Sequence, residues 1–374
     1  MADPVRVGVI GVGWGALVHV PGFRAAAGFE PVAICSRRPE SLEKAGARTG
    51  ITDLSTDWKD FVRRDDLDMI SISSPVGLHR EMTLAAAAAG KRVLCEKPAA
   101  LTVADAKDML DAAESAGVPH ATCFELRWLP ERLAVWDAVR AGLVGKAYNL
   151  RSIHSADYWH PTHAPQSEWM YQREEGGGYL MGLLSHDIDF ACALLGEPEA
   201  VAADVRTNTP RRTLADGREI EVDADDTTVV LIRFKGGASA VLSCSVVGAH
   251  TAGMRLDLFG EDGTLLIESG PQGRRVTGGS AKDAGLVDMP LNEREPKGGP
   301  VAAKGRSAGM IRAMALLLED WQDNLASPDA AIPTLRAGWR AMKVIEAARR
   351  SAAGEGWVAL DCHGSPLEGH VVLL

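Results

Sequence analysis

The chain has 374 residues, which is long for one hydrophobic core and sufficient for two domains. Hydrophobic residues make up 46% of it and charged residues 24%, as in ordinary globular proteins, and no stretch approaches the roughly 20 apolar residues that a membrane span needs. The formal net charge of −10 disfavours nucleic-acid binding, which requires clustered Lys and Arg. We therefore expect neither a nucleic-acid nor a membrane partner.

The start of the chain and its cysteines indicate a reducing compartment. Met-Ala-Asp-Pro leads directly into the apolar run 5–10, without the basic flank and cleavage site of a signal peptide, so we expect a cytoplasmic protein. His160 and His163 lie close in sequence but lack a third ligand, so no metal site is predicted. The cysteines form no Cys-x-x-Cys pair and are interpreted as buried thiols: Cys35, Cys95, Cys123, Cys192, Cys244 and Cys362.

Short apolar runs alternate with Ala-rich helical stretches in the first third of the chain. This alternation is typical of βαβ units around a parallel sheet, and the continuous Val, Ile and Leu character of the runs fits strands covered on both faces. The predicted strands span 5–10, 31–35, 68–73, 92–95 and 119–124, and the predicted helices span 15–27, 39–47, 78–89 and 103–116.

After a predicted helix at 130–141, longer alternating segments appear, which are typical of an antiparallel sheet with one solvated face. Residues 269–307 are rich in Gly, Pro and charge, and we interpret them as a lid, an arm toward a neighbouring subunit or a disordered segment. The other predicted strands span 146–156, 227–234, 238–247 and 254–259, and the other predicted helices span 178–195, 310–325 and 335–350.

A glycine-rich turn, 11–16, follows the first predicted strand and matches Gly-x-Gly-x-x-Ala. Gly11 allows a tight turn, Gly13 lets the backbone approach a pyrophosphate, and Ala16 allows close helix–strand packing. Because the turn joins a strand to a helix, we expect it to bind a dinucleotide, with Trp14 and Gly15 also at the cofactor.

The end of the second predicted strand indicates which dinucleotide binds. NAD sites usually have an Asp or Glu there, whereas this chain has Ser36, Arg37 and Arg38, whose hydroxyl and guanidinium groups suit a 2′-phosphate. Glu30 precedes the predicted strand and lies at the wrong edge of the sheet. NADP is therefore favoured over NAD, although the two arginines also fit solvated loop charges.

Glu96 and Lys97 follow the buried strand 92–95, at the edge where open α/β sheets bind ligands. Pro98 restricts Lys97 to an extended conformation and prevents a helix from starting there. A partly desolvated lysine beside a nicotinamide could pass a proton to or from a reacting oxygen. The alternative interpretation is a surface ion pair at the start of a loop.

Further motifs complete a longer pattern. They are Ser73-Ser74-Pro75, Leu78-His79, the run Ala-Gly-Lys-Arg-Val-Leu-Cys-Glu-Lys-Pro at 89–98, and Gly176-Gly177-Gly178 followed by Ser185-His186 and Asp189. Together with the glycine turn, they resemble the glucose-fructose oxidoreductase/inositol dehydrogenase/MocA (Gfo/Idh/MocA) family. The resemblance implies an α/β protein with a Rossmann NAD(P)-binding domain at 1–125. It implies a substrate-binding and oligomerisation α/β domain at 126–374, with an open-faced, mostly antiparallel sheet, and homodimers or homotetramers.

The same resemblance implies an NAD(P)-dependent oxidoreductase acting on a sugar, a cyclic polyol or a related hydroxy or keto compound. Lys97 would transfer the proton, His186 would bind the reacting oxygen, and Glu96 would help to hold the nicotinamide ribose. The remaining residues that match family positions at the cofactor are Ser73, Ser74, Pro75, His79 and Arg127.

One position departs from the family, because Gly182 replaces the Asp that usually precedes the histidine by one helical turn. Asp187 points about 100° away on a helix and is no simple substitute. Three interpretations stay open. The chain is an oxidoreductase in which Tyr179, Asp157 or Tyr158 supplies the lost contact, a redox-assisted glycosidase that retains its nicotinamide, or a non-catalytic protein that senses cofactor or metabolite.

Aromatic residues of the second domain are candidate contacts for a ring-shaped, hydroxylated substrate. Each of them fits a packing residue as well. They are Tyr158, Trp159, His160, Trp169 and Tyr179.

Overall fold

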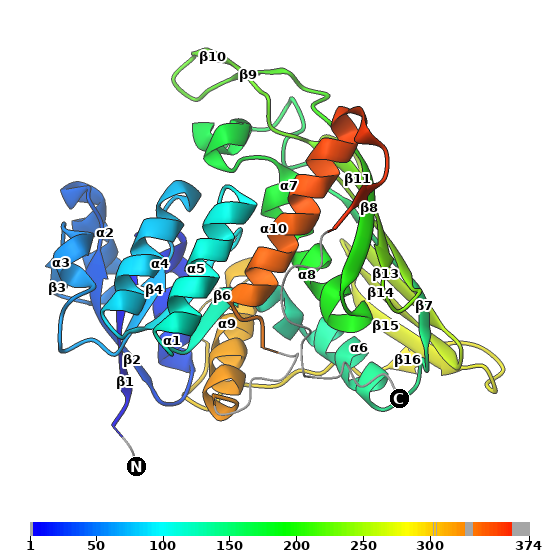
Figure 1. Ribbon diagram of the computed structural model, residues 1–374, viewed down its shortest axis with the longest axis horizontal. Helices are drawn as coiled ribbons and strands as arrows, with labels where there is room; N and C mark the ends of the chain where they lie inside the picture. The colour runs from blue at the N-terminus through cyan, green and yellow to red at the C-terminus, as the bar shows by residue number, and fades with distance from the viewer. Residues whose placement is uncertain (1–2, 302, 304, 326–331, 361–374) are drawn as a thin grey trace. The chain divides into compact units, whose positions relative to one another are not determined.

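The structure is a computed structural model and describes residues 3–301, 303, 305–325 and 332–360. The chain divides into two compact units (Figure 1). Unit 1 comprises Met1–Leu129 and Glu293–Trp339, and unit 2 comprises Pro130–Asn292 and Arg340–Leu374. This division differs from the predicted domains 1–125 and 126–374 chiefly because residues 293–339 return to the first unit. Within the described residues, no helix is long and apolar enough to cross a membrane.

Unit 1 is built on a six-stranded parallel sheet with the order β3-β2-β1-β4-β5-β6. The order reverses between β1 and β4, which is where open α/β sheets bind their ligands. Residues of β4 are all buried, as expected for a strand covered on both faces. The strands are β1 (Val5–Ile10), β2 (Phe29–Cys35), β3 (Asp53–Ser55), β4 (Met69–Ile72), β5 (Arg92–Glu96) and β6 (His120–Cys123).

Helices cover this sheet, and α4 and α5 lie side by side (Figure 1). The predicted helix 15–27 is divided into a wider π-helical turn, η1, and α1. The helical segments are η1 (Gly15–His19), α1 (Val20–Ala25), α2 (Pro39–Thr49), α3 (Trp58–Phe61), η2 (Val76–Leu78), α4 (His79–Ala88), α5 (Val103–Ser115), η3 (Glu125–Trp128) and α9 (Arg306–Asp323).

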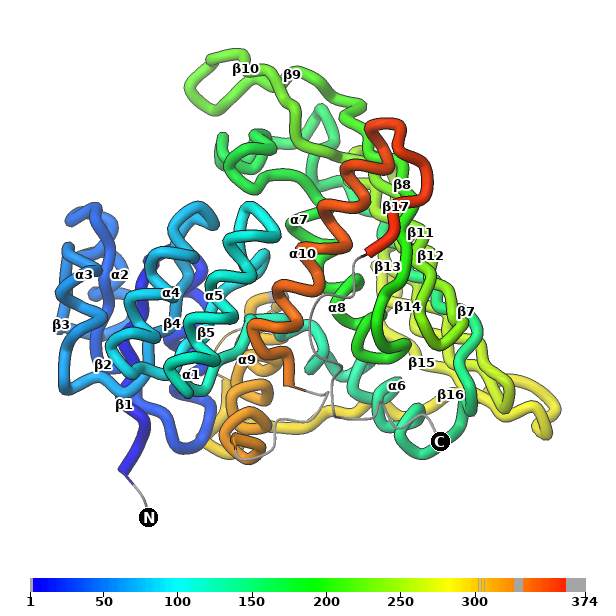
Figure 2. Tube along the Cα trace, viewed as in Figure 1, coloured from blue at the N-terminus to red at the C-terminus, as the bar shows by residue number. Residues whose placement is uncertain are grey.

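Helix α9 explains why residues 293–339 belong to unit 1. It packs against α1 and η3, and Figure 2 shows its trace beside that of α1. The indole nitrogen of Trp128 donates a hydrogen bond to Asp320 at 2.7 Å. A Cβ on Gly22 would lie 2.6 Å from Cγ of Met314, so a residue without a side chain lets the two helices approach closely. These contacts join segments that are far apart in sequence.

Unit 2 contains a nine-stranded sheet with the order β16-β15-β14-β13-β7-β12-β11-β8-β17. All neighbouring strands are antiparallel except β7 and β12. Helices α7 and α8 pack on one face, and alternate residues of β11, such as Val229 and Leu231, are exposed on the other. The open-faced, mostly antiparallel sheet is therefore confirmed.

The elements of unit 2 run as follows. They are α6 (Pro130–Arg140), β7 (Ala147–Ser155), η4 (Glu168–Tyr171), η5 (Arg173–Glu175), α7 (Tyr179–Gly182), α8 (Leu184–Leu195), β8 (Pro198–Arg206), β9 (Arg211–Thr213), β10 (Glu219–Glu221), β11 (Thr227–Phe234), β12 (Ser239–Ser245), β13 (Gly253–Gly260), β14 (Gly263–Gly270), β15 (Gly273–Ser280), β16 (Val287–Met289), η6 (Ser351–Glu355) and β17 (Val358–Ala359). Helix α10 (Leu335–Arg350) begins in unit 1 and continues into unit 2.

Two sequence predictions need correction here. Part of segment 269–307 forms β15 and β16 at the edge of the sheet, so the interpretation as a disordered segment is wrong for those strands, whereas the roles as a lid or an arm stay interpretations. The single helix predicted at 178–195 breaks at Leu183 into α7 and α8. The prediction of buried thiols is confirmed for the five described cysteines, which are free, whereas Cys362 lies outside the described residues.

Candidate active site

The glycine turn lies at the reversal of strand order in unit 1. Gly11 has a φ of 113°, and a Cβ there would lie 2.1 Å from the carbonyl oxygen of Ser73, so the loops after β1 and β4 are in direct contact. The backbone N–H of Ser73 donates to the carbonyl of Ile10 at 2.8 Å. Glycine is thus required at residue 11 by conformation and by close approach.

The rest of the turn fits a dinucleotide. A Cβ on Gly13 would meet no atom within 4 Å, so protein packing does not require glycine there, whereas a ligand close to the backbone would. Ala16 is buried, and a Cβ on Gly15 would lie 3.0 Å from Val9, so small residues set the packing of η1 on β1. Trp14 precedes η1 and is partly exposed. The start of η1 therefore offers backbone N–H groups to a pyrophosphate.

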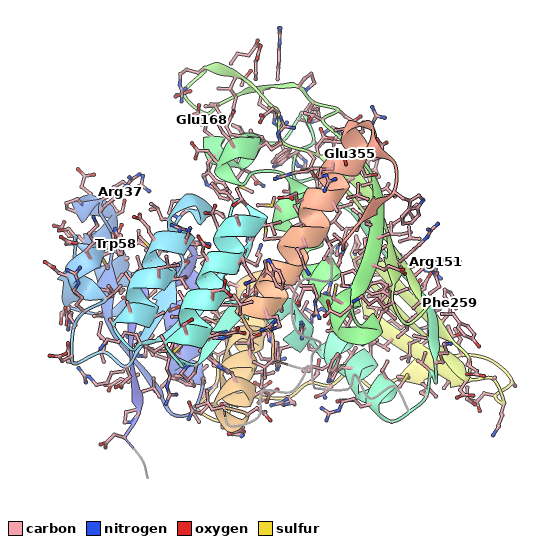
Figure 3. All side chains as sticks on the ribbon, viewed as in Figure 1. Arg37, Trp58, Arg151, Glu168, Phe259 and Glu355 are labelled. Atoms are coloured by element: carbon pink, nitrogen blue, oxygen red, sulfur yellow. The ribbon has the colours of Figure 1, made fainter. Side chains whose placement is uncertain are left out.

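The residues after β2 carry positive charge. The N–H of Ser36 bonds to the carbonyl of Ser55, and Arg37 and Arg38 are exposed, with Arg37 at the surface in Figure 3. The nearby Asp57 accepts hydrogen bonds from two backbone N–H groups of α3, so this carboxylate caps a helix. Glu30 lies near the start of β2, not before the strand as expected, and its carboxylate is 3.9 Å from Arg6.

His79 joins two loops at the same edge. Its ring nitrogens lie 3.0 Å from the carbonyl oxygen of Ser74 and 3.1 Å from that of Pro98, which connects the loop after β4 with the loop after β5. Burial lowers the pKa of His79, although the surrounding carbonyls oppose this effect. Pro75, which directly follows Ser74, precedes η2 and is exposed. His79 thereby fixes the loop that begins with Lys97.

Glu96 is buried at the end of β5 and bonded to the protein through both oxygens. Oε1 lies 2.8 Å from Nε2 of His19, and Oε2 accepts from the N–H of Lys97 at 3.0 Å. The other ring nitrogen of His19 lies 2.7 Å from the hydroxyl of Ser71. Burial alone would raise the pKa of Glu96, but the hydrogen bond from His19 and the charges of His19 and Lys97 hold it below its ordinary value.

This arrangement was not anticipated from the sequence, because His19 lies 52 residues from Ser71 and 77 residues from Glu96 along the chain. The atoms of His19, Glu96 and Cys123 that could act as metal ligands lie within 4.8 Å of one another, a spacing that would also suit a metal ion. Both ring nitrogens of His19 are already bonded, so we interpret the group as a hydrogen-bonded network.

Lys97 directly follows this network and is half-buried. Its peptide bond to Pro98 is cis. Arg127 is buried on η3, the segment that follows β6, and belongs to the same unit. Unit 1 therefore brings the glycine turn, the 73–75 loop, His79 and the Glu96–Lys97 pair to the carboxyl edge of one sheet.

In unit 2, the three-glycine motif leads into α7. Gly178 has a φ of 92°, and a Cβ there would lie 2.2 Å from Oδ1 of Asp225. Oδ2 of Asp225 accepts from the N–H groups of Tyr179 and Leu180 at 3.1 and 2.7 Å and from the hydroxyl of Thr228 at 2.9 Å. Burial raises the pKa of Asp225. Asp225 caps α7 from the neighbouring strand loop, a role that local sequence does not reveal.

His186 lies in the first turn of α8 and is buried. The next residue, Asp187, pairs with Arg132 of α6, and its other oxygen lies 2.6 Å from Nε2 of His154 on β7. Burial opposes ionisation, but the charges and hydrogen bonds of His154 and Arg132 hold the pKa of Asp187 well below its ordinary value. A Cβ on Gly182 would meet no atom within 4 Å. The missing family carboxylate would thus have space in unit 2.

The predicted aromatic contacts divide into packed and exposed residues. Trp159 is 1% exposed, and its ring lies 4.6 Å from the ring of Tyr171 and 5.1 Å from that of Tyr179, so these contacts favour a packing role over a substrate contact. Tyr158 stacks on Tyr179 at 6.1 Å and is half-buried. Trp169 on η4 is 45% exposed.

His160 is half-buried in the loop after β7. Its Nδ1 lies 2.8 Å from the hydroxyl of Thr162, and its carbonyl accepts from Arg212 at 3.3 Å. The ring of His163 is 5.7 Å away. Of the five predicted contacts, Tyr158, His160 and Trp169 therefore keep the most accessible surface in unit 2.

Comparisons with known proteins match both halves of the chain. The model for the oxidoreductase family with an NAD-binding Rossmann fold matches residues 5–123, and the model for the GFO/IDH/MocA C-terminal domain matches residues 133–266. Levoglucosan dehydrogenase of Pseudarthrobacter phenanthrenivorans is 28% identical over 95% of this chain and 97% of its own. Myo-inositol 2-dehydrogenase of Thermotoga maritima is 30% identical over 71% of this chain and 75% of its own.

A solved structure extends the similarity to the whole fold. Levoglucosan dehydrogenase in complex with NADH and L-sorbose has a TM-score of 0.83 and 26% identity, covering 96% of this chain and 100% of that one. Both halves of the protein are thus matched by sequence models, and both are matched by structure. The chain belongs to the Gfo/Idh/MocA family of oxidoreductases, and its Rossmann fold is the NAD-binding domain of that family.

Proposed function

We propose that this protein is an NADP-dependent oxidoreductase of a sugar, a cyclic polyol or a related hydroxy or keto compound. The nicotinamide, when bound, supplies or accepts the hydride. Lys97 gives a proton to the reacting oxygen or takes one from it, and His186 hydrogen-bonds to that oxygen. The names of the relatives support the substrate class, since they include dehydrogenases of levoglucosan, myo-inositol and D-apiose.

One observation carries the proposal: a half-buried lysine at the carboxyl edge of the same Rossmann sheet whose first strand leads into the glycine turn. Glu96 fixes the backbone of Lys97 through the bond to its N–H, and His79 fixes the carbonyl of Pro98. The lysine is thus held in the strand-end position where this fold binds its cofactor.

The choice of NADP rests on the residues after β2. Ser36, Arg37 and Arg38 offer one hydroxyl and two guanidinium groups, while Asp57 is used to cap α3. A 2′-phosphate gains charge-assisted hydrogen bonds from such a group, whereas a ribose diol gains fewer. NAD is the alternative cofactor.

The test combines binding and turnover. Fluorescence titration with NADPH and NADH is expected to show binding, tighter for NADPH, and absorbance at 340 nm is expected to change with a member of a sugar and polyol panel. Lys97→Ala should lower kcat at least about a hundredfold without loss of cofactor binding. Lys107→Ala, which changes an exposed lysine on α5, serves as the control. Absence of cofactor binding, or full activity of the Lys97 variant, would refute the proposal.

The same assay separates the two rival functions that Gly182 leaves open. A redox-assisted glycosidase would form product from a glycoside without net change in nicotinamide absorbance. A sensing protein would bind the cofactor without turnover of any substrate in the panel. Either result would replace the dehydrogenase or reductase assignment.

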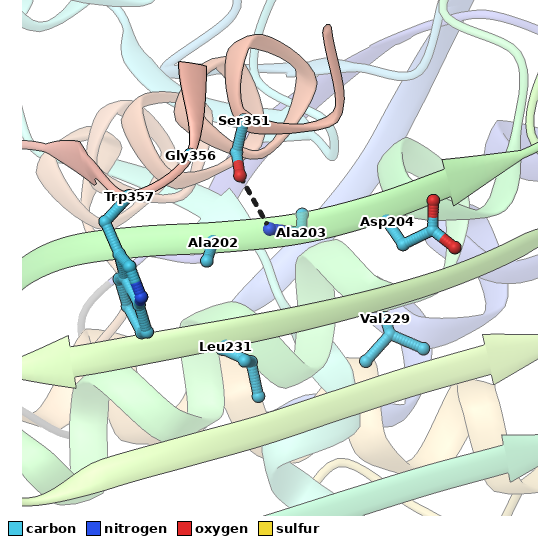
Figure 4. A pocket seen from close by; sticks show the side chains of 8 residues that line it. All are labelled: Ala202, Ala203, Asp204, Val229, Leu231, Ser351, Gly356 and Trp357. Atoms are coloured by element: carbon cyan, nitrogen blue, oxygen red, sulfur yellow. Dashed lines mark hydrogen bonds between the residues drawn. The ribbon is translucent and has the colours of Figure 1, made fainter. Parts of the chain in front are cut away.

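We also propose that the protein is a homodimer or homotetramer joined through the open sheet face of unit 2. Val229, Leu231 and Trp357 are exposed on or beside this face. Figure 4 shows a hollow there, lined by residues of β8, β11 and the segment around η6, so it does not surround His186. Light scattering is expected to give a dimer or tetramer, and Leu231→Asp is expected to give monomers.

A further inference from the structure

Arg212 is a buried arginine of unit 2, on the hairpin that β9 and β10 form (Figure 1). It is the middle residue of β9 and is 7% exposed, whereas its neighbours Arg211 and Thr213 are exposed. Successive side chains of a strand point to opposite faces, so Arg212 lies on the inner face of the hairpin. A charged side chain is thus turned toward the interior of unit 2.

The guanidinium of Arg212 contacts the segment that follows β7. It lies over the ring of Tyr171, 5.5 Å from its centre, and Nη1 donates a hydrogen bond to the carbonyl oxygen of His160 at 3.3 Å. Nε and Nη2 are buried and have no hydrogen-bond partner among the described residues. Buried polar groups without a partner are rare, and a charged one is especially costly, so these two nitrogens indicate a ligand.

The two unpartnered nitrogens form one edge of the guanidinium. Nε–H and Nη2–H point in the same direction in the plane of the group, so together they match the two oxygens of a carboxylate or a phosphate. Nη1, which makes the bond to His160, is not part of this edge. Arg212 therefore keeps the pair of donors that binds an oxyanion in a bidentate way.

Nearby acidic residues do not neutralise Arg212. Glu168 of η4 and Asp216 of the hairpin turn lie 2.9 and 2.8 Å from nitrogens of Arg218. In the part of the chain that the structure describes, no carboxylate pairs with Arg212. The counter-ion of this guanidinium has to come from outside these residues.

Both ends of the hairpin are tied to the rest of unit 2. Asp226 is fully buried and accepts hydrogen bonds, each of 2.8 Å, from the backbone and side chains of Asn208 and Thr209, just before β9. After β10, the N–H groups of Asp223 and Ala224 donate to the carbonyl oxygen of Tyr171. These bonds fix the position of β9, so the site is organised before a ligand binds.

We propose that Arg212 binds the acidic group of the substrate, which is a carboxylate or a phosphate carried by a sugar or polyol. The proposal rests on the proposed function and adds the charge of the substrate to it. Nε and Nη2 of Arg212 donate to two oxygens of the group, beside His160, which is one of the predicted substrate contacts. Because these nitrogens lie below the surface, the group gives up water on binding, and its bonds to the guanidinium are strong.

Isothermal titration calorimetry on the whole chain tests the site, without cofactor and again on Lys97→Ala saturated with NADPH, in which turnover is blocked. The probes are D-glucuronate, D-gluconate and D-glucose 6-phosphate, each compared with D-glucose. At least one acidic probe is expected to bind about tenfold tighter than glucose or more, because it gains charge-assisted hydrogen bonds. If every acidic probe binds no tighter than glucose, the proposal is overturned.

Substitution at neighbouring residues locates the binding. Arg212→Lys keeps the charge but loses the two parallel N–H groups, so it is expected to weaken the acidic probe by about tenfold or more. Arg212→Met should abolish the preference for acid and melt at the same temperature as wild type or higher, because it removes a buried charge without a partner. Arg211→Lys and Arg211→Met, on the exposed face of the same strand, are the matched controls. An acid preference that survives in both Arg212 variants would overturn the proposal.

Inorganic phosphate and acetate separate a substrate site from a site for free anions. Both are expected to bind more weakly than the acidic sugar, since they lack its hydroxyl groups. If either binds as tightly and depends equally on Arg212, the site holds a free anion and the assignment to substrate is wrong.

The two proposals can fail separately. Lack of turnover on the whole panel would refute the proposed function and leave the calorimetric comparison of Arg212 and Arg211 variants intact. In an active enzyme, the ratio of kcat/KM for the acidic to the neutral substrate should fall about tenfold or more in Arg212→Lys, with little change for the neutral one. An unchanged ratio would overturn the role of Arg212 even in an active enzyme.

Discussion

Asp187, which directly follows His186 on α8, pairs with Arg132 of α6 in the interior of unit 2. Both side chains are almost completely buried, and the guanidinium also lies over the ring of Phe190, 5.0 Å from its centre. A charged pair in this position fixes the first turn of α8. The orientation of His186 therefore depends on a contact made by its neighbour.

We predict that Asp187→Asn destabilises the protein by about 3–5 kcal/mol, because it leaves the charge of Arg132 buried without its counter-ion. Urea unfolding followed by tryptophan fluorescence measures the change. The double variant Arg132→Met, Asp187→Leu should recover part of the lost stability, since it removes both charges. Equal stability of wild type and Asp187→Asn would show that the pair contributes nothing.

The contribution of the same pair to folding stability depends on pH in a direction that can be predicted. The pKa of Asp187 is lowered in the folded protein, so its contribution is complete above the unfolded-state pKa of about 3.9 and is lost as the pH falls toward the folded value. Wild type should therefore lose stability more steeply than Asp187→Asn below about pH 4. Parallel stability curves in that range would contradict the assignment.

Two glycines at opposite ends of α7 provide a matched pair of substitutions. Gly178→Ala is expected to destabilise the protein by several kcal/mol, because residue 178 has positive φ and its Cβ would lie 2.2 Å from Asp225. Gly182→Ala, at the other end of α7, meets no atom within 4 Å and should be neutral or stabilising by up to about 1 kcal/mol. Thermal unfolding compares the two, and equal effects would refute the structural explanation.

Much of this fold follows from local pattern. Strands β1 and β11 have the predicted bounds, because their apolar residues recur continuously in one and alternately in the other. Strand β3 has only three residues and carries no such pattern. Strand β15 contains Gly278, whose Cβ would lie 2.4 Å from Met289 on β16, so packing selects a residue that disfavours strands by itself.

The candidate site divides in the same way. The glycine turn and the Glu96–Lys97 pair can be found from sequence because each occupies a few consecutive residues at a strand end. The His19–Glu96 bond and the Asp225 cap cannot be found in that way, because they join residues 77 and 45 or more positions apart. Such contacts arise from strand order and helix packing, which local periodicity does not encode.

Restoring the family carboxylate tests the meaning of Gly182. Gly182→Asp is expected to fold, because its Cβ would have open space in unit 2, and to change the relative rates on members of the sugar and inositol panel. An added carboxylate four residues before His186, at the end of α7, alters the local field and offers a new acceptor to substrate hydroxyls. Gly182→Asn, which adds the same volume without charge, is the control. If both variants keep the wild-type rates, residue 182 does not set specificity.

Cofactor preference tests the charges after β2. Arg37→Ala and Arg38→Ala are each expected to lower kcat/KM for NADPH by about tenfold or more, because each removes a charge-assisted hydrogen bond to the 2′-phosphate worth about 1.5–3 kcal/mol. The value for NADH should change little, since NADH has no phosphate at that position. Arg48→Ala, in the last turn of α2, controls for loss of surface charge. If NADPH and NADH are affected equally, the two arginines are solvated surface residues, and the preference for NADP loses its support.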